Sequence, residues 1–368
     1  MWKHPRCTTL ILGFFMLAAP AMAAQTQPAA QDPSTATLPP IVLPYSNFAS
    51  PEARVLAGRL LHEPPFVFGD DIAKARQHYG RYNDDRLAEV RALYSTRDER
   101  QALGGVPVDI VVPAEGVSGR NADRVLINVH GGAWMWGSGS GALVEAIPIA
   151  SVGRIKVVAV DYRLAPEHRY PAASEDVAAV YRELLKTYRP ENIGLYGCSA
   201  GGVVVAQATA WFQTHDLPTP GAIGTFCGTG SGYGGDSIFL GQATTGGTAP
   251  PPAAADTIGI PNPYMAGVAL DDPEAYPVTD DAVIARFPPT LLIGGGRDFA
   301  ASTLTTMHRR LAAVGVESEL FLFDGLWHAF FVWPDLPESR EAYGLIAGFF
   351  ERRLGGPAVA PAPGPARP

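Results

Sequence analysis

The chain has 368 residues, 47% of them hydrophobic, and a formal net charge of −8 at pH 7. This length and apolar content are enough for one large α/β domain with an additional lid. The modestly acidic balance, with no Lys/Arg run longer than a short pair, argues against nucleic acid as a partner.

The first 24 residues are typical of a secretory signal peptide. A basic stretch at 1–6 precedes an apolar run at 10–17, and Ala21-Met22-Ala23 provides the small residues of a cleavage site, with cutting after Ala23 or Ala24. An apolar run of this length is too short to span a bilayer comfortably, so a cleaved signal is favoured over a stable membrane anchor. We therefore expect an exported protein, periplasmic or extracellular.

Two Pro- and Ala-rich segments flank the rest of the chain. Residues 25–44 predict a disordered linker and residues 355–368 a disordered tail. The block at 45–104 has apolar residues three or four positions apart, over Ala53–Leu61 and Asp70–Leu93, which is the helical period. We expect this block to form a small helical cap region.

From residue 105 to 354 the pattern alternates between strands and helices. The expected strands are Val106–Val112, Arg124–His130, Lys156–Tyr162, Asn192–Cys198, Gly221–Gly228, Pro289–Gly295 and Ser318–Asp324. The expected helices are Ala172–Thr187, one that follows Cys198 and runs to Thr214, Ser302–Val314 and Glu338–Arg353. This alternation predicts an α/β fold with a mostly parallel central sheet flanked by helices. The stretch at 229–277 breaks the rhythm and is too long for an ordinary connection, so we expect a pocket-rim or cap insertion there.

The segment Gly197-Cys198-Ser199-Ala200-Gly201 lies between a predicted strand and a predicted helix. That context is required of a nucleophile elbow, in which glycines two residues before and after the serine prevent strand and helix from colliding. The elbow would expose the Ser199 hydroxyl at a helix N-terminus, where developing negative charge is favoured. A Gly/Ser-rich turn without catalytic function is the alternative for this segment taken alone.

Small residues also follow the strand that ends near His130. Backbone N–H groups of Gly131, Gly132 and Ala133, together with the amide of Ala200, would form an oxyanion hole. The alternative is a Gly-rich connection between a strand and a helix.

Two further residues complete a possible catalytic triad. Asp298 follows a predicted strand and could orient a histidine, although a helix N-cap is an alternative role, and Asp324 is a rival for the acid. His328, in a loop after the last strand, could act as general base or be a buried structural histidine. The order Ser199, Asp298, His328 is that of α/β-hydrolases, which weakens these alternatives.

Four motifs together resemble the hormone-sensitive-lipase-like branch of α/β-hydrolase esterases. They are HGGAW at 130–134, DYRLAPE at 161–167, GCSAGG at 197–202 and GLWHAF at 325–330. The resemblance covers roughly residues 50 to 353. It implies Ser199 as nucleophile, His328 as base, Asp298 as acid, oxyanion donors from the glycine motif and Ala200, and a helical cap. It also implies that Asp161 and Arg163 brace the oxyanion loop.

The chain departs from the family pattern at three places. Ala133 replaces the third glycine, Cys198 replaces the usual Asp beside the serine, and Asp298 is followed by Phe299-Ala300. An alanine in place of glycine makes any positive φ more costly.

These motifs predict an exported serine carboxylic ester hydrolase that acts on short to medium acyl, or aryl and alkyl, esters through an acyl-enzyme. Trp134, Trp327 and Phe330 are the expected substrate-binding residues, since they would narrow the pocket. An amidase, peptidase or lactonase on the same triad, or an inactive binding protein, remain alternatives.

The partner would be a small-molecule ester, and no metal or organic cofactor is implied, because H-E-x-x-H and C-x-x-C are both missing from the sequence. Cleavage of the signal would leave Cys198 and Cys227, which could form a disulfide in an exported protein. Both fall at the ends of predicted interior strands, however, so buried free thiols are favoured.

Overall fold

A computed structural model describes residues 42–64, 66, 71–244 and 262–356. The predicted signal peptide, most of the predicted linker and nearly all of the predicted tail lie outside these residues. The chain divides into two units, one that ends at Leu43 and one that begins at Pro44. The sheet, its helices and the site all belong to the second unit.

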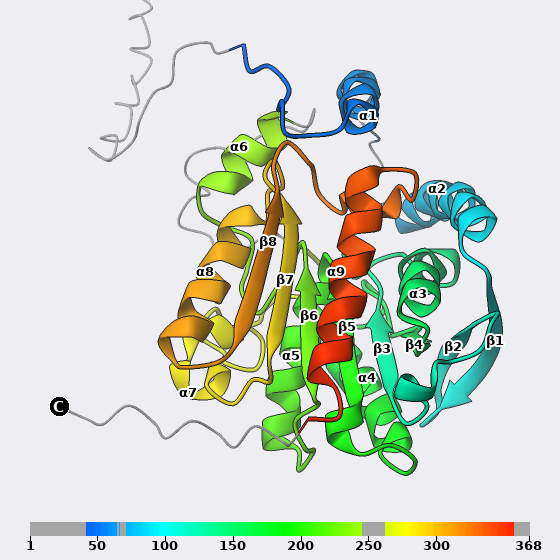
Figure 1. Ribbon diagram of the computed structural model, residues 1–368. Helices are drawn as coiled ribbons and strands as arrows, with labels where there is room; N and C mark the ends of the chain where they lie inside the picture. The colour runs from blue at the N-terminus through cyan, green and yellow to red at the C-terminus, as the bar shows by residue number, and fades with distance from the viewer. Residues whose placement is uncertain (1–41, 65, 67–70, 245–261, 357–368) are drawn as a thin grey trace, which may run out of the picture. The chain divides into compact units, whose positions relative to one another are not determined.

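An eight-stranded sheet in the order β1-β2-β4-β3-β5-β6-β7-β8 forms the centre of this unit (Figure 1). The strands are β1 (Thr96–Leu103), β2 (Val106–Pro113), β3 (Val125–Val129), β4 (Lys156–Val160), β5 (Ile193–Cys198), β6 (Ala222–Phe226), β7 (Thr290–Gly295) and β8 (Ser318–Phe323). All neighbours from β4 to β8 pair in parallel, whereas β2 is antiparallel to both β4 and β1. The expected α/β fold with a mostly parallel sheet is therefore confirmed.

The central strands are buried on both faces. Every residue of β3, β5, β6 and β7 is buried, which explains why these strands appear in the sequence as continuous apolar runs. Parallel strands of this kind need helices on both faces to exclude water.

Two layers of helices supply that cover. The described helices are α1 (Pro51–His62), α2 (Ile72–Leu93), α3 (Ser140–Gly153), α4 (Ala172–Leu184), α5 (Ala200–Thr214), α6 (Asp236–Thr244), α7 (Asp281–Ile284), α8 (Ala301–Ala313) and α9 (Pro337–Arg353). Short 3-10 turns occupy Gly119–Asn121, Pro190–Asn192, Pro277–Thr279 and Phe330–Val332. Helices α3 and α9 pack on one face of the sheet and share a core that includes Ile147 and Phe350. Helices α4, α5 and α8 pack on the other face, around a core that includes Val177 and Leu304.

The expectation that the whole block at 45–104 is helical is wrong at its C-terminal end. Helices α1 and α2 lie where the apolar period predicts them, but β1 occupies the last part of the block and pairs with β2. Strand β1 is almost entirely exposed and highly charged, so it has no apolar alternation. Its sequence signal is the Gly104-Gly105 turn, in which both residues have positive φ, as a two-residue hairpin turn requires.

Helix α3 is an element that the predicted strands and helices did not include. It begins after two glycines at 137 and 139 and contains Pro148, both of which are typical of loops and not of helix interiors. Burial against the sheet outweighs these weak local preferences, because most of its residues, among them Val144 and Ile147, are buried.

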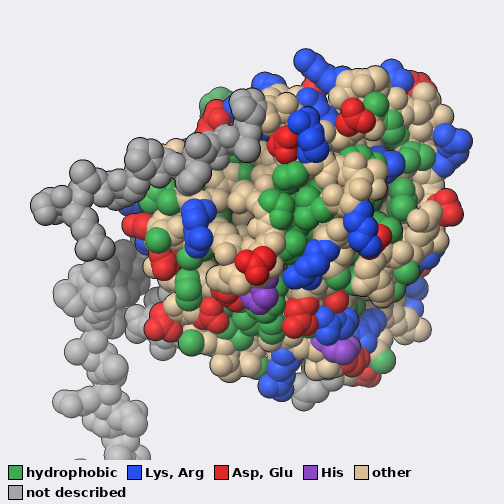
Figure 2. All heavy atoms as spheres, turned by 90° about the horizontal axis from the view of Figure 1, so that it is seen from below, with side chains coloured by type: hydrophobic (Ala, Val, Ile, Leu, Met, Phe, Trp, Pro, Cys, Tyr) green, Lys and Arg blue, Asp and Glu red, His purple; other side chains and the backbone are tan. Residues whose placement is uncertain are grey.

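Helices α1 and α6 lie above the carboxyl ends of the strands (Figure 1). On the face seen from the opposite end, basic and acidic side chains are interspersed (Figure 2). No helix within the described ranges combines the length and the apolar character that crossing a membrane would need. Cys198 and Cys227 are both free and buried, which confirms the expectation of buried thiols.

Candidate active site

Ser199 lies in a strained turn between β5 and α5, with φ 57° and ψ −124°. The turn brings strand and helix so close that a Cβ on Gly201 would lie 1.9 Å from the Val129 carbonyl oxygen. A Cβ on Gly197 would lie 2.3 Å from the same oxygen. Both glycines are therefore obligatory, and the backbone itself projects the Ser199 hydroxyl from the sheet edge.

The three side chains of the expected triad form a continuous chain of hydrogen bonds. His328 Nε2 lies 2.8 Å from Ser199 Oγ, and His328 Nδ1 lies 2.8 Å from Asp298 Oδ1. In the neutral imidazole, an Nδ1–H that donates to Asp298 leaves Nε2 free to accept the serine proton. Asp298 is fully buried and also accepts from the Ala300 amide at 2.8 Å, which fixes its carboxylate.

The rival acid is engaged elsewhere. Asp324 accepts a hydrogen bond from the Ser46 hydroxyl, and both ring nitrogens of His328 are engaged by Ser199 and Asp298. Because Asp298 follows the neighbouring strand β7, it reaches the imidazole nitrogen that faces away from Ser199. The structure thus brings together Ser199, His328 and Asp298.

Two aromatic residues near the triad carried no motif in the sequence. The Phe299 ring stacks on the His328 imidazole with centroids 4.2 Å apart. Tyr233 packs edge-on against Phe299 and donates to the Cys227 carbonyl at 3.3 Å. Burial raises the pKa of Tyr233 well above its ordinary value, so its phenol stays neutral. Phe299 therefore supports one face of the imidazole, and Tyr233 supports Phe299.

In the glycine loop, residues 130–134, two of the three amides expected to form the oxyanion hole are free of protein acceptors within the described ranges. Gly132 and Ala133 have φ values of 115° and 52°, and neither amide donates to a protein acceptor in the described part of the chain. Ala200 is the first residue of α5, so its amide has no acceptor within the helix. The expectation for Gly131 is wrong, because its N–H donates to Glu145 Oε1 at 2.8 Å and is not available to an oxyanion.

The loop is braced by residues other than those the family resemblance implied. The Tyr162 hydroxyl donates to the His130 carbonyl at 2.9 Å, and the Ala165 amide donates to the Trp134 carbonyl at 2.8 Å. Arg76 Nε from α2 donates to the Met135 carbonyl, in the same turn, at 2.8 Å.

Asp161 and Arg163 do not contact the loop directly. Asp161 pairs with Arg100 of β1, and Arg163 Nε pairs with Asp176 of α4 at 2.9 Å. Asp161 and Arg163 therefore tie the segment after β4 to β1 and to α4. The buried Tyr162 between them, in contrast, contacts the glycine loop.

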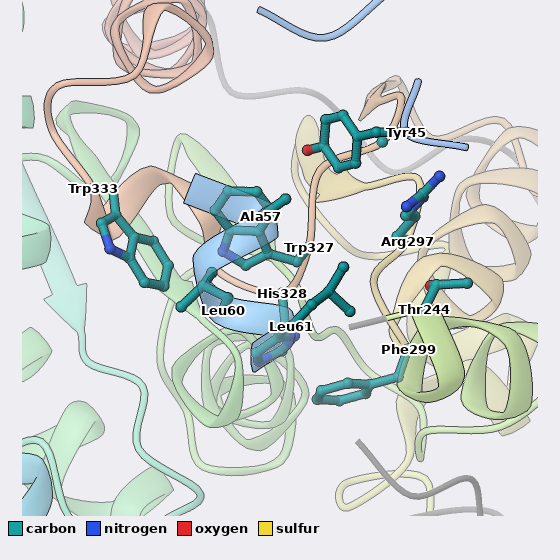
Figure 3. A pocket seen from close by; sticks show the side chains of 11 residues that line it. Tyr45, Ala57, Leu60, Leu61, Thr244, Arg297, Phe299, Trp327, His328 and Trp333 are labelled. Carbon is teal, nitrogen blue, oxygen red and sulfur yellow. The ribbon is translucent and has the colours of Figure 1, made fainter. Parts of the chain in front are cut away.

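A cavity of about 280 Å³ opens beside His328 (Figure 3). Its lining is largely apolar: Tyr45, Ala57, Leu60, Leu61, Thr244, Arg297, Phe299, Gly325, Trp327, His328 and Trp333. Trp327 lies in this wall, as expected. Trp134 and Phe330 do not: Trp134 stacks on Tyr264, and Phe330 is fully buried. Bulky residues at strand ends can point into the core as well as into the pocket, and the sequence does not distinguish the two.

The segment from Pro44 to α1 forms one side of the cavity and is held by polar contacts to distant parts of the chain. Arg297 Nη2 donates to the Pro44 carbonyl at 2.8 Å. The Ser46 hydroxyl donates to Asp324, and the Ser50 amide donates to Glu338 Oε1 at 2.7 Å. Of the insertion predicted at 229–277, the described parts include α6, whose last residue, Thr244, lines the cavity.

One group of described residues has metal-ligand chemistry. The ligand atoms of Cys227, Asp298 and His328 lie within 4.8 Å of one another. The Asp298 and His328 side chains are already bonded to each other, and burial raises the pKa of Cys227 to about 11, so the thiol is protonated near neutral pH. A protonated thiol is a poor metal ligand.

Comparison with known proteins agrees with this geometry. Residues 126–332 match the family model described as the alpha/beta hydrolase fold, Abhydrolase_3, and the chain belongs to this family. Within it, the four motifs and the solved relatives place the chain among the hormone-sensitive-lipase-like esterases.

Three similar proteins illustrate the relationship. An acetyl-hydrolase from Streptomyces hygroscopicus is 30% identical over 270 residues, which cover 69% of this chain and 85% of the relative. The crystal structure of esterase E25 has a TM-score of 0.73 at 27% identity and covers 87% of this chain and 99% of that one. A bacterial esterase of the hormone-sensitive lipase family has a TM-score of 0.69 at 26% identity, over 83% of this chain and 99% of that one.

Proposed function

We propose that this protein is an exported serine esterase that cleaves carboxylic esters through an acyl-enzyme. The observation that carries the proposal is the hydrogen-bonded chain from Ser199 through His328 to Asp298 at the edge of an apolar cavity. The names of relatives such as the Streptomyces acetyl-hydrolase support the same reaction class.

In the first step His328 Nε2 takes the proton from Ser199 Oγ as the oxygen attacks the ester carbonyl carbon. The carbonyl oxygen becomes an oxyanion and accepts hydrogen bonds from the amides of Gly132, Ala133 and Ala200. His328 then gives its proton to the departing alcohol, and the acyl group stays on Ser199.

The second step repeats the first with water as nucleophile. His328 deprotonates the water, the tetrahedral intermediate uses the same three amides, and the acid leaves as Ser199 regains its proton. Throughout, the buried Asp298 carboxylate stabilises the imidazolium and keeps Nδ1 protonated.

The substrate range that fits this site is short to medium acyl esters. A cavity of about 280 Å³ is just below the usual size range of ligand pockets. Its wall of Leu60, Leu61, Phe299 and Trp327 favours apolar acyl or alkyl groups and limits their length.

Two measurements test the reaction. Labelling by a fluorophosphonate probe, mapped to Ser199 by mass spectrometry, separates a working triad from an inactive binding protein. A nitrophenyl ester series from acetate to palmitate, run beside the matching anilides, should show butyrate-range esters turned over fastest and anilides far more slowly. Faster turnover of the long-chain esters or of the anilides would contradict the proposed substrate class.

Export is the remaining part of the proposal, and the residues that suggest it lie at 1–24. Expression of the full chain in a bacterial host, followed by fractionation and intact-mass analysis, tests it. We expect a mature protein that starts after Ala23 or Ala24 outside the cytoplasm. An uncleaved cytoplasmic protein would contradict export and leave the esterase proposal unaffected.

A further inference from the structure

Glu145 of α3 reaches the point where the glycine loop meets the nucleophile elbow. Its Oε1 accepts the Gly131 amide at 2.8 Å, and its Oε2 accepts from Asn128 Nδ2 of β3 at 3.2 Å. A Cβ built on Gly131 would lie 3.3 Å from Glu145 Oε1 and 3.4 Å from Ser199 Cβ. The carboxylate is therefore packed directly behind the loop, next to the elbow.

The elbow itself offers no carboxylate at this point. The residue before the nucleophile is Cys198, whose thiol is buried and whose pKa burial raises well above its ordinary value. Its backbone amide adds a further favourable interaction with the Glu145 carboxylate. In this chain the carboxyl group behind the glycine loop thus comes from α3, an element far from the elbow in sequence.

The surroundings of Glu145 contain no balancing charge among the described residues. The titratable side chains that face it are Tyr162, Tyr196 and Cys198, all kept neutral because burial raises each pKa well above its ordinary value. Burial also raises the pKa of Glu145 from 4.5 to about 7, against the opposing effect of its hydrogen bonds with Gly131 and Asn128 and of the nearby Cys198 amide. A costly buried carboxyl of this kind needs a reason to be there.

We propose that Glu145 is a positioning residue for the oxyanion hole: by holding the Gly131 amide it directs the next two amides, those of Gly132 and Ala133, toward the reacting oxygen. This role rests on the proposed ester hydrolysis by Ser199. Gly131 is the last residue of the loop with an ordinary φ, and the following residues take up positive φ. Fixing the first amide therefore fixes the start of a strained turn whose later amides must remain unbonded.

Misplaced oxyanion donors lower the rate and leave ground-state binding almost unchanged, because the oxyanion exists only in the transition state. Glu145 touches no reacting atom, so its loss should cost less than the loss of a donor itself, which is worth about 10²- to 10³-fold in turnover. We expect a loss of roughly 10- to 100-fold in kcat, with little change in KM.

The test compares two substitutions of similar length. Glu145→Gln keeps an oxygen that can accept the Gly131 amide. Once the Asn128 side-chain amide flips, the glutamine NH₂ can donate to Asn128 Oδ1, which has no partner among the described residues. Glu145→Met keeps the length and offers no acceptor. A small cavity of about 10 Å³ beside Glu145, lined by Tyr196 and Phe226, gives the methionine room.

With nitrophenyl butyrate at pH 8, Glu145→Met should lower kcat by roughly 10- to 100-fold and change KM by less than about 3-fold, while Glu145→Gln stays within about 3-fold of wild type. Binding of a trifluoromethyl ketone, whose adduct with Ser199 places an oxyanion in the hole, should weaken in Glu145→Met by the same factor as kcat.

A wild-type kcat in Glu145→Met, or a loss in Glu145→Gln as large as in Glu145→Met, would overturn the positioning role. Should Glu145→Met not fold, Glu145→Asp withdraws the carboxylate by one methylene, and wild-type turnover in that variant would equally overturn it. Covalent labelling of Ser199 and turnover by the wild type decide the esterase proposal separately.

Discussion

The end of the sheet that carries the triad and the wall of the cavity beside it are built on different principles. At the sheet end, backbone geometry places each group: the Ser199 turn, the Gly201 contact with Val129 and the positive φ of Gly132 leave almost no choice of residue. In the wall, side chains from α1, α6 and the 325–333 loop meet through long-range contacts. The chemistry is thus fixed locally by steric constraints, whereas substrate fit depends on tertiary packing that tolerates change.

The largest effect should come from the nucleophile. Ser199→Ala is expected to lower turnover on the order of a million-fold and leave the fold intact, because alanine fits the turn and only the hydroxyl is lost. His328→Ala should cost as much, and the double variant no more, since the two side chains act as one unit. The measurement is nitrophenyl butyrate turnover beside thermal unfolding, and additive losses would separate His328 from the nucleophile.

The acid of the triad should matter less than the nucleophile and much more than its rival. Asp298→Asn is expected to lower kcat by roughly 10⁴-fold, because the amide cannot stabilise the imidazolium and favours the wrong tautomer. The matched control is Asp324→Asn, whose carboxylate bonds to Ser46. It should remain within a few-fold of wild type, and a collapse of activity there with a silent Asp298→Asn would mean that the acid is misassigned.

Changes in the wall should alter selectivity and spare the chemistry. Leu61→Trp is expected to lower kcat/KM for an octanoate ester roughly 10-fold more than for an acetate ester, because the larger ring shortens the cavity. Val55→Trp, a substitution at an outward position of the same helix that is 75% exposed, is the control and should leave the ratio unchanged. Equal losses on both esters would mean that Leu61 does not limit acyl length.

The smallest effect is a pH dependence of stability that originates behind the glycine loop. Because the folded protein raises the pKa of Glu145 from 4.5 to about 7, its stabilising contribution is complete below pH 4.5 and is lost as pH rises through 7. The side chain of the Glu145→Gln variant stays neutral, so the variant does not lose this stability as pH rises. The Tm of the variant minus the Tm of the wild type should therefore increase by a few degrees between pH 5 and pH 8. Thermal unfolding of both proteins at several pH values measures this, and a constant difference would place the ionisation elsewhere.

The sequence predicts the sheet-end features well for a physical reason. Short sequence patterns predict the strand ends and the glycines that allow close backbone approach, because both are local features. The order of Ser199, Asp298 and His328 can likewise be seen directly along the chain. The sequence does not predict whether a given side chain points into the cavity or into the core. Trp134 and Phe330 carry the same apolar signal as Trp327, yet only Trp327 lines the cavity.

Secondary-structure elements without an apolar period are also poorly predicted from the sequence. Strand β1 is charged and lies at the edge of the sheet, and α3 begins after glycines and contains Pro148, so neither shows its period clearly. The role of Glu145 could not be predicted from the sequence either, because it depends on where α3 packs. Only tertiary structure shows that its carboxylate meets the Gly131 amide and removes that amide from the oxyanion hole.

The contacts that hold the segment from Pro44 to α1 also set an order of events during synthesis. Pro44, Ser46 and Ser50 bond to groups that lie 253, 278 and 288 residues further along the chain. A ribosome makes this segment early and its anchoring groups almost last, and contacts of such separation form late because long loops must close first. The cavity can therefore close only when synthesis is nearly complete, because Arg297, Asp324 and Glu338, which anchor its N-terminal side, are made last.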